Sequence, residues 1–359
     1  MGFYEYFLLC EMLGAKPLPV LSMGVACQFR STEMYDIDSP EFEEFVQDAL
    51  DLIEFANGPV DSKWGSLRAK MGHPDSFNMD MIAIGNEQWE TETVQLFKRN
   101  DRFEKAIHEK YPGFKLLGTA GPIVDTDITP QAWDYYRKGF ERNKDFCYAV
   151  DEHYYKSPQW MYDNVALYDD YPRDVAVFAG EYASHTTDRS NSVEAALSEA
   201  ALMTGFENNA GVVKLASYAP LFNRIGHSQW KPDMIWFDAK DVYLTPSYYV
   251  QKMFACNLGS HSLTLTDEAI ELRKKGIYIC ASQYEDGRII IKAVNTTKEE
   301  FELDLSGMNS DKATIETMVS AGVAEDDLPE PVSVSISSIL VSANAKLLPE
   351  SFSVITGEN

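Results

Sequence analysis

Short apolar runs alternate with longer amphipathic segments through the first two-thirds of the chain. The apolar runs are continuous rather than alternating, which is typical of strands buried on both faces of a parallel sheet. Six strands are predicted, at residues 16–23, 79–85, 114–118, 146–150, 175–179 and 212–216. Helices are predicted before and between them, at residues 4–13, 40–56, 93–111, 129–143, 159–168 and 192–208. This order and spacing predict parallel βαβ units.

The predicted helices carry recognisable end signals. Ser39 is placed to cap the helix at 40–56, and Pro40 suits its first turn. Gly58 is expected to end that helix, and Gly14 to end the helix at 4–13.

After about residue 260 the pattern becomes one of short β-rich segments. Strands are predicted at residues 278–283, 288–294, 301–305, 333–341 and 351–355, with an acidic loop at 324–331. Glu285, Asp286 and Gly287 form a hairpin turn signal between the first two of these strands. We therefore expect an antiparallel β-sandwich at residues 256–359, after a parallel α/β domain at residues 1–255.

The charge and cysteine content of the chain exclude several classes of binding partner and site. The 359 residues include 31 basic and 56 acidic side chains, a net charge of −25, which argues against nucleic acid and against an anionic membrane surface. No apolar run approaches the roughly 18 residues that span a bilayer. The five cysteines are scattered without a CxxC pair, so neither a disulfide framework nor a zinc site is expected.

Polar clusters follow several predicted strands. Glu87 comes after the second strand within Asn86–Trp89, and Glu181 comes after the fifth. The fourth strand runs into Asp151–Tyr155, and a loop with Gln229 and Trp230 follows the sixth. In a (β/α)8 barrel the carboxyl ends of the strands meet at one rim, where active sites form. We therefore expect Glu87 and Glu181 to face each other across a cleft.

Two facing carboxyl groups are the device of glycoside hydrolysis. In a retaining enzyme one attacks the anomeric carbon and the other protonates the leaving oxygen, at a separation of about 5–5.5 Å. Trp89, Tyr155 and Trp230 could stack on sugar rings. The competing interpretation is that both glutamates are helix N-terminal carboxylates, favoured by the helix dipole. Packing roles for Trp89 and for the rim residue His153 also stay open.

The motifs strongly resemble those of the α-L-arabinofuranosidases of glycoside hydrolase family 51. The resemblance rests on an ordered set of segments: GNEQW at 85–89, DEHYY at 151–155, GEYA at 180–183, YAPLF at 218–222, WKPDMIWFD at 230–238 and PSYYVQK at 246–252. GAKP at 14–17 and FANGP at 55–59 match as well, and the likeness continues more weakly to PESFSV at 349–354.

The resemblance implies roles for individual residues. Glu87 is the implied acid/base and Glu181 the implied nucleophile. Asn86 is implied to bind the sugar 2-hydroxyl, with His153, Tyr155 and Gln229 also lining the substrate site. The implied substrates are glycans with terminal non-reducing arabinofuranosyl residues, and neither a metal nor an organic cofactor is implied.

The resemblance begins in the helix before the family's third barrel strand. Six of eight strands are therefore expected, in an incomplete (β/α)8-type TIM barrel, with two βα units of roughly 60–80 residues absent. A truncated gene sequence, with Met1 an internal methionine, is the simplest explanation, and little activity is expected from the chain as given. The open alternatives are another retaining glycosidase of the same barrel type, an endo-glucanase or β-xylosidase, and an inactive carbohydrate-binding remnant. Compartment and homo-oligomerisation stay open.

Overall fold

The computed structural model describes residues 1–308, 310, 312–321 and 334–358. The expected loop at 324–331 lies outside these residues. The chain forms two compact units: the first comprises residues 1–153 and 173–178, and the second residues 154–172 and 179–359. Each unit is described by itself. The predicted division into 1–255 and 256–359 stays a prediction.

Six parallel strands form one sheet, in the order in which they occur along the chain. They are β1 (Val20–Leu21), β2 (Met81–Ile84), β3 (Lys115–Thr119), β4 (Ala149–Lys156), β5 (Ala176–Ser184) and β6 (Val213–Tyr218). The pairing is parallel between β1 and β2, β2 and β3, and β3 and β4. Chain-order pairing of parallel strands with helices between them is the arrangement of an incomplete (β/α)8 barrel, as predicted.

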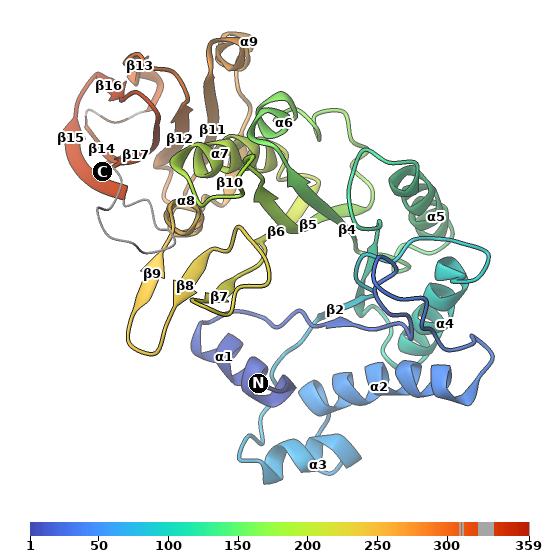
Figure 1. Ribbon diagram of the computed structural model, residues 1–359. Helices are drawn as coiled ribbons and strands as arrows, with labels where there is room; N and C mark the ends of the chain where they lie inside the picture. The colour runs from blue at the N-terminus through green and yellow to red at the C-terminus, as the bar shows by residue number, and fades with distance from the viewer. Residues whose placement is uncertain (309, 311, 322–333, 359) are drawn as a thin grey trace. The chain divides into compact units, whose positions relative to one another are not determined.

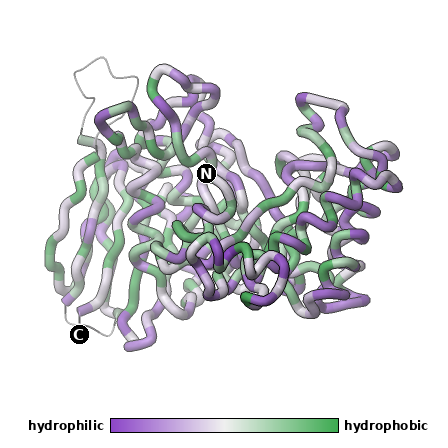
Figure 2. Tube along the Cα trace, turned by 90° about the horizontal axis from the view of Figure 1, so that it is seen from below, coloured by the Kyte–Doolittle hydropathy of each residue, from purple (hydrophilic) through white to green (hydrophobic). Residues whose placement is uncertain are grey.

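Helices alternate with these strands, as the amphipathic pattern predicts. They are α1 (Phe3–Met12), α2 (Pro40–Asn57), α3 (Lys63–Lys70), α4 (Leu96–Lys110), α5 (Ile128–Arg142), α6 (Pro158–Asp163) and α7 (Val193–Asn208). Figure 1 shows α2, α4 and α5 along the outer side of the strands of the first unit. The buried residues of α2, α4 and α5 recur at helical spacing, so each of these three helices buries one face and exposes the other. Figure 2 shows hydrophilic and hydrophobic residues interspersed along the chain.

Local signals explain where two of the helices begin and end. The Ser39 hydroxyl accepts a hydrogen bond from the Phe42 backbone N–H at 3.2 Å, which caps α2 as predicted. Gly14 follows α1 with a φ of +66°, the left-handed conformation that ends a helix. Gly58 also ends α2, but with an extended backbone, so its role there is not conformational.

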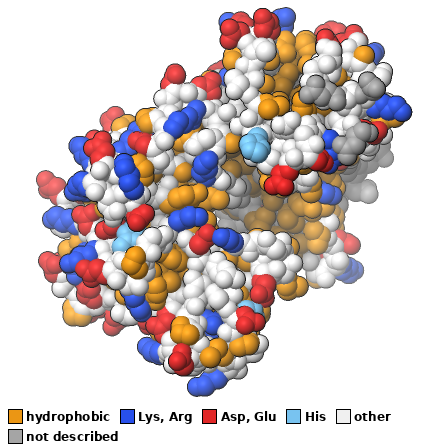
Figure 3. Space-filling view, turned by 180° about the vertical axis from the view of Figure 1, so that it is seen from behind, with side chains coloured by type: hydrophobic (Ala, Val, Ile, Leu, Met, Phe, Trp, Pro, Cys, Tyr) orange, Lys and Arg blue, Asp and Glu red, His pale blue; other side chains and the backbone are white. Residues whose placement is uncertain are grey.

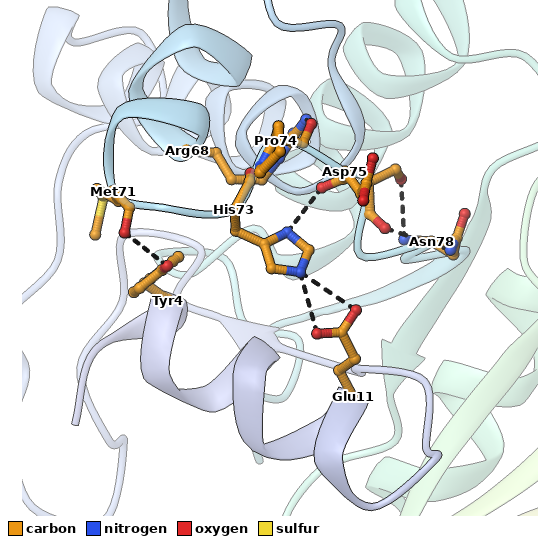
Figure 4. A network of polar contacts seen from close by, with 9 residues as sticks. Tyr4, Glu11, Arg68, Met71, His73, Pro74, Asp75 and Asn78 are labelled. Carbon is orange, nitrogen blue, oxygen red and sulfur yellow. Dashed lines mark hydrogen bonds and ion pairs between the residues drawn. The ribbon is translucent and has the colours of Figure 1, made fainter.

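A histidine network holds the start of the first unit together (Figure 4). The His73 ring lies with Nε2 3.1 Å from a Glu11 carboxylate oxygen of α1 and Nδ1 2.9 Å from the Asp75 carbonyl oxygen. The same ring stacks on Phe77 at 4.1 Å. Nearby, the Tyr4 hydroxyl donates to the Met71 carbonyl at 2.8 Å. These contacts fasten α1 to the loop after α3.

The second unit contains the antiparallel sheets that the β-rich pattern predicts. They are a six-stranded sheet of order β10-β11-β12-β17-β14-β15 and a two-stranded sheet of β13 and β16. A further three-stranded sheet is mixed, because β7 is parallel to β8 and β8 is antiparallel to β9. Their bounds are β7 Phe222–Arg224, β8 Ile235–Phe237, β9 Val242–Leu244, β10 His261–Leu263, β11 Ile277–Gln283, β12 Ile289–Asn295, β13 Phe301–Asp304, β14 Ala313–Ser320, β15 Val334–Val341, β16 Asn344–Leu347 and β17 Ser351–Gly357. Along the chain, α8 (Pro246–Ala255) connects β9 to β10, and α9 (Asp267–Glu271) lies between β10 and β11.

The predicted hairpin is confirmed, because β11 and β12 pair antiparallel on either side of Glu285–Gly287. Several other strands were not predicted. The strands β7, β8 and β9 have three residues each, too few to show a period. In β14 buried and half-buried residues alternate, but Thr and Glu break its apolar run.

Surface charge is mixed in sign. Figure 3 shows acidic and basic side chains interspersed over the face seen from behind. None of the helices in the described residues combines the length and apolar character that a membrane span requires.

The helix α7 is buried on all sides and carries a buried carboxyl group. Its residues 195–206 are all buried, which explains why the segment lacks a polar face. Glu199 within it is 0% exposed, and its Oε1 accepts a hydrogen bond from the Ser184 backbone N–H at 2.9 Å. Burial raises the pKa of Glu199 to about 7, despite the opposing effect of that hydrogen bond.

Glu199 therefore predicts a pH-dependent stability. Its folded pKa lies above the ordinary carboxyl value, so the native state binds the extra proton and is favoured at low pH. The free energy of unfolding should fall between about pH 4.5 and 7, by on the order of 3 kcal/mol in total. Glu199→Gln is neutral at every pH and keeps an acceptor for Ser184, so it should lose this dependence in urea titrations. Glu194→Gln, an exposed substitution on the same helix, should keep it; an unchanged profile in Glu199→Gln would refute the assignment.

Candidate active site

The turn after β2 places Glu87 in an uncommon backbone conformation. Gly85 has a φ of +84° and Glu87 a φ of +65°, so two of three consecutive residues are left-handed. A Cβ on Gly85 would lie 3.0 Å from the Gln88 Oε1 and 3.2 Å from the Met23 Cε, so a larger residue there would also push on the ends of these two side chains. The Gln88 amide oxygen accepts from the Asn86 backbone N–H at 2.5 Å and braces the turn. Strain of this kind in a non-glycine residue is a feature of functional sites.

The Glu87 carboxyl group meets a buried histidine. Its Oε1 lies 2.8 Å from the His153 Nδ1, and the His153 Nε2 lies 3.2 Å from the Asp151 Oδ2. The side chains of His153 and Asp151 are 0% and 4% exposed, whereas that of Glu87 is 23% exposed. The imidazole ring therefore connects a buried carboxylate to one that reaches solvent.

The strand β4 explains this arrangement through its two-residue period. Asp151, His153 and Tyr155 share one face of the strand. On the opposite face, Glu152 accepts from the Trp133 indole N–H at 2.6 Å. Tyr154, also on that face, is 0% exposed and packs among aromatic rings, consistent with the packing role predicted for it.

Glu181 lies within β5 of the second unit and is held by Tyr155. The Tyr155 hydroxyl donates to the Glu181 Oε2 at 2.6 Å, the short distance typical of a hydrogen bond to a carboxylate. Because Glu181 is inside a strand and Glu87 follows a strand nine residues before α4, neither is a helix N-terminal carboxylate. That competing interpretation is therefore excluded.

An aromatic group surrounds Tyr155 in the second unit. The Tyr155 ring stacks on His185 at 5.3 Å and meets Trp230 edge-on at 5.6 Å. The Arg189 guanidinium lies 5.1 Å from the centre of the Trp230 ring. Burial, and then the nearby Arg189 charge, lower the pKa of His185 to about 4. His185 is therefore a neutral ring at physiological pH, suited to a wall of a sugar site.

The remaining predicted residues are more exposed. Asn86 and Gln229 are both exposed, and Gln229 lies beside Trp230 in the loop between β7 and β8. Trp89 donates its backbone N–H to the Gln28 Oε1 at 2.9 Å, and its ring lies 5.2 Å from the ring of Phe29. Trp89 thus has the packing contact that was kept as an alternative to sugar stacking.

Two residues of the site were not singled out from the sequence. Asp151 and His185 each lie in a polar cluster that the apolar pattern predicts to follow a strand, whereas β4 continues through Lys156 and β5 through Ser184. The two-residue period of a strand could have identified Asp151, because it is two residues before His153 and therefore on the same face of an extended chain.

A parallel barrel-type sheet with one glutamate just after β2 and another within β5 fits the class of barrel glycoside hydrolases. Two family models match the chain: the alpha-L-arabinofuranosidase 1 domain over residues 1–173, and the alpha-L-arabinofuranosidase C-terminal domain over residues 162–347. The chain is 43% identical over 262 residues to an extracellular exo-alpha-L-arabinofuranosidase of Streptomyces chartreusis, covering 72% of this chain and 30% of that protein. It is 32% identical over 313 residues to alpha-L-arabinofuranosidase 2 of Arabidopsis thaliana, covering 85% of this chain and 42% of that protein.

Solved structures agree with this assignment. The arabinose-bound MgGH51 α-L-arabinofuranosidase has a TM-score of 0.79 and 25% identity, covering 99% of this chain and 56% of that one. An α-L-arabinofuranosidase of Thermotoga maritima in complex with arabinose has a TM-score of 0.71 and 18% identity, covering 100% of this chain and 79% of that one. The chain belongs to the α-L-arabinofuranosidases of glycoside hydrolase family 51. It spans less than half the length of the two curated relatives above.

The neutral state of His185 can be tested directly by NMR. The ring signals of His185 should titrate near pH 4, well below the ordinary histidine value. Arg189→Ala removes a like charge and should raise the midpoint, but burial is the larger cause, so the midpoint should stay below the ordinary value. Arg224→Ala, at another exposed arginine, should leave it unchanged. A wild-type midpoint near pH 6.5 would contradict this account of the site.

Proposed function

We propose that this chain carries the catalytic pair of a retaining, exo-acting α-L-arabinofuranosidase, with Glu181 as nucleophile and Glu87 as acid/base. The observation that supports the proposal is that each glutamate is held, within its own unit, by a side chain of β4. His153 contacts Glu87 at 2.8 Å, and Tyr155, two residues further on, contacts Glu181 at 2.6 Å. A retaining mechanism requires the two carboxyl groups to be about 5–5.5 Å apart.

The reaction proceeds in two steps. In the first, a Glu181 oxygen attacks C1 of the arabinofuranosyl ring while Glu87 gives its proton to the departing glycosidic oxygen. In the second, Glu87 takes a proton from water, and the oxygen of that water attacks C1 and releases Glu181. Two inversions at C1 give arabinose of retained configuration. The Tyr155 hydrogen bond keeps one Glu181 oxygen engaged and orients the other for attack.

The substrate contacts follow the same arrangement. Asn86, next to the acid/base, is proposed to bind the sugar 2-hydroxyl, and Gln229, in the loop after β7, is proposed as a further substrate contact. His153, which contacts Glu87, and Tyr155, which contacts Glu181, are proposed to line the substrate site as well. Terminal arabinofuranosyl groups of arabinose-containing glycans are the proposed substrates, in keeping with the activity in the names of the relatives.

Stereochemistry of azide rescue separates the roles of the two glutamates. Glu181→Ala removes the nucleophile, so azide should enter its space and give a glycosyl azide of inverted configuration. Glu87→Ala should lower turnover by roughly 10²–10⁴-fold. On an aryl arabinofuranoside its glycosyl-enzyme still forms, so azide should restore turnover with retained configuration.

The matched control is Glu152→Gln, a change at a buried carboxylate on the opposite face of β4, which should need no rescue. Products of the opposite stereochemistry would reverse the two assignments. The assay is run on a chain extended by two N-terminal βα units from a family relative.

The extension is itself a test. Residues 1–359 alone should hydrolyse p-nitrophenyl α-L-arabinofuranoside weakly, because six strands supply only part of an eight-stranded rim. The extended chain should hydrolyse the same substrate at least roughly 10²-fold faster than residues 1–359 alone, because the added strands supply further contacts that position the sugar. Full activity from residues 1–359 would show that six strands suffice. Faster hydrolysis of a β-xyloside or a glucan would favour the rival glycosidases, and binding without turnover would favour the carbohydrate-binding remnant.

A further inference from the structure

Asp151 has no role in the proposed mechanism, yet it is the buried end of the chain of contacts that leads to Glu87. It is 3% exposed, and its Oδ2 lies 3.2 Å from the His153 Nε2. Its second oxygen, Oδ1, is buried and has no hydrogen-bond partner among the described residues. Burying a carboxylate costs free energy unless another group compensates its charge, so the presence of an aspartate at this position needs a physical reason.

The hydrogen atoms of the trio can be assigned from its chemistry. A carboxylate only accepts hydrogen bonds, so Asp151 requires a proton on the His153 Nε2. In the neutral ring the Nδ1 is then an acceptor, and the 2.8 Å contact with the Glu87 Oε1 needs a proton from Glu87. If that proton moves to Nδ1 instead, the ring becomes a cation between two carboxylates. In both forms one proton is held between Glu87 and His153.

The other titratable groups around Asp151 and His153 do not supply this charge. Tyr136 of α5 interacts with Asp151, and burial raises its pKa well above the ordinary value, so it is neutral. Burial raises the pKa of the neighbouring Cys147 thiol to about 12, so it too is neutral. Glu181, which the proposed function places opposite Glu87, adds a negative charge that also favours retention of the proton. Asp151 is therefore the negative charge in direct contact with the ring on the side away from substrate.

We infer that Asp151 is a positioning residue that fixes the tautomer of His153 and keeps the shared proton on the Glu87–His153 pair to higher pH. Loss of the proton would leave two negative charges beside a neutral buried ring, and Asp151 makes that loss harder. His153 thereby acts as the second carrier of the proton that Glu87 donates and recovers. The inference deepens the proposed function and rests on it for its link to catalysis.

The first measurement needs neither a substitution nor activity. Nitrogen-15 NMR of labelled histidine in the chain of residues 1–359 reports which ring nitrogen carries the proton in the neutral state. His153 should show a protonated Nε2 and a bare Nδ1. The opposite tautomer would overturn the inference, whatever the activity of the protein.

The second measurement follows the His153 ring through a pH titration. Asp151→Asn removes the charge at nearly constant volume and should move the midpoint of His153 down by about one pH unit or more, the effect of one contacting charge. Asp151→Glu keeps the charge and should restore most of the shift. Glu152→Gln, an identical chemical change at the next residue but on the other face of β4, should have no effect. An unmoved midpoint in folded Asp151→Asn would refute the inference.

The third measurement connects the trio to catalysis in the extended, active chain. Asp151→Asn should move the basic limb of the pH profile of kcat/KM to lower pH by the shift seen in NMR, with activity at the acid side within a few-fold of wild type. A loss of equal size at every pH would mean that Asp151 is merely structural. If wild type hydrolyses no arabinofuranoside, the proposed function fails, while the two NMR results still decide the role of Asp151.

Discussion

The two-residue period of β4 is the constraint on which the site depends. Because its side chains point alternately to opposite sides, one strand can pack against the core through Glu152 and Tyr154 while presenting Asp151, His153 and Tyr155 to the chemistry. A shift of one residue in register would exchange the two sets. Glu152 would then lose its 2.6 Å contact with the Trp133 indole, and Glu87 would lose its imidazole partner. The core contacts of β4 and the proposed catalytic contacts therefore enforce the same register.

The same register explains what the sequence could and could not predict. Apolar runs predicted all six parallel strands, because buried parallel strands are continuous hydrophobic segments. The apolar runs did not predict where β4 and β5 end. Both strands continue beyond the runs, through Asp151–Lys156 and Glu181–Ser184, and the polar residues of these extended segments lie on the face that carries the candidate site. Hydrophobic periodicity cannot distinguish such a strand end from a loop.

The candidate site was predictable in its residue types but not in its contacts. Glu87 and Glu181 stood out because each follows a buried strand, and the family resemblance assigned their roles. The 2.8 Å contact between His153 and Glu87 joins residues 66 apart in sequence, and nothing local to either residue specifies it. Asp151 was overlooked because an acidic residue after a strand is usually solvated. His185 was overlooked because its pKa of about 4 results from burial by the folded chain.

Buried charge is used in two different ways in this molecule. Lys292 of β12 is 1% exposed and pairs with Glu207 of α7, so that each charge compensates the other. No lysine or arginine in the described part of the chain pairs with Asp151, and its charge is offset only if a proton resides on the ring between it and Glu87. If residue 151 served stability alone, an asparagine would satisfy the same geometry without the cost of a buried charge.

The left-handed turn at Gly85–Glu87 is also unfavourable locally, because it strains the backbone to bring the Glu87 carboxyl group onto His153. The buried charge of Asp151 and the strained turn at Gly85–Glu87 each disfavour folding locally. In the proposed mechanism, both help Glu87 to hold a proton, release it and recover it within one catalytic cycle.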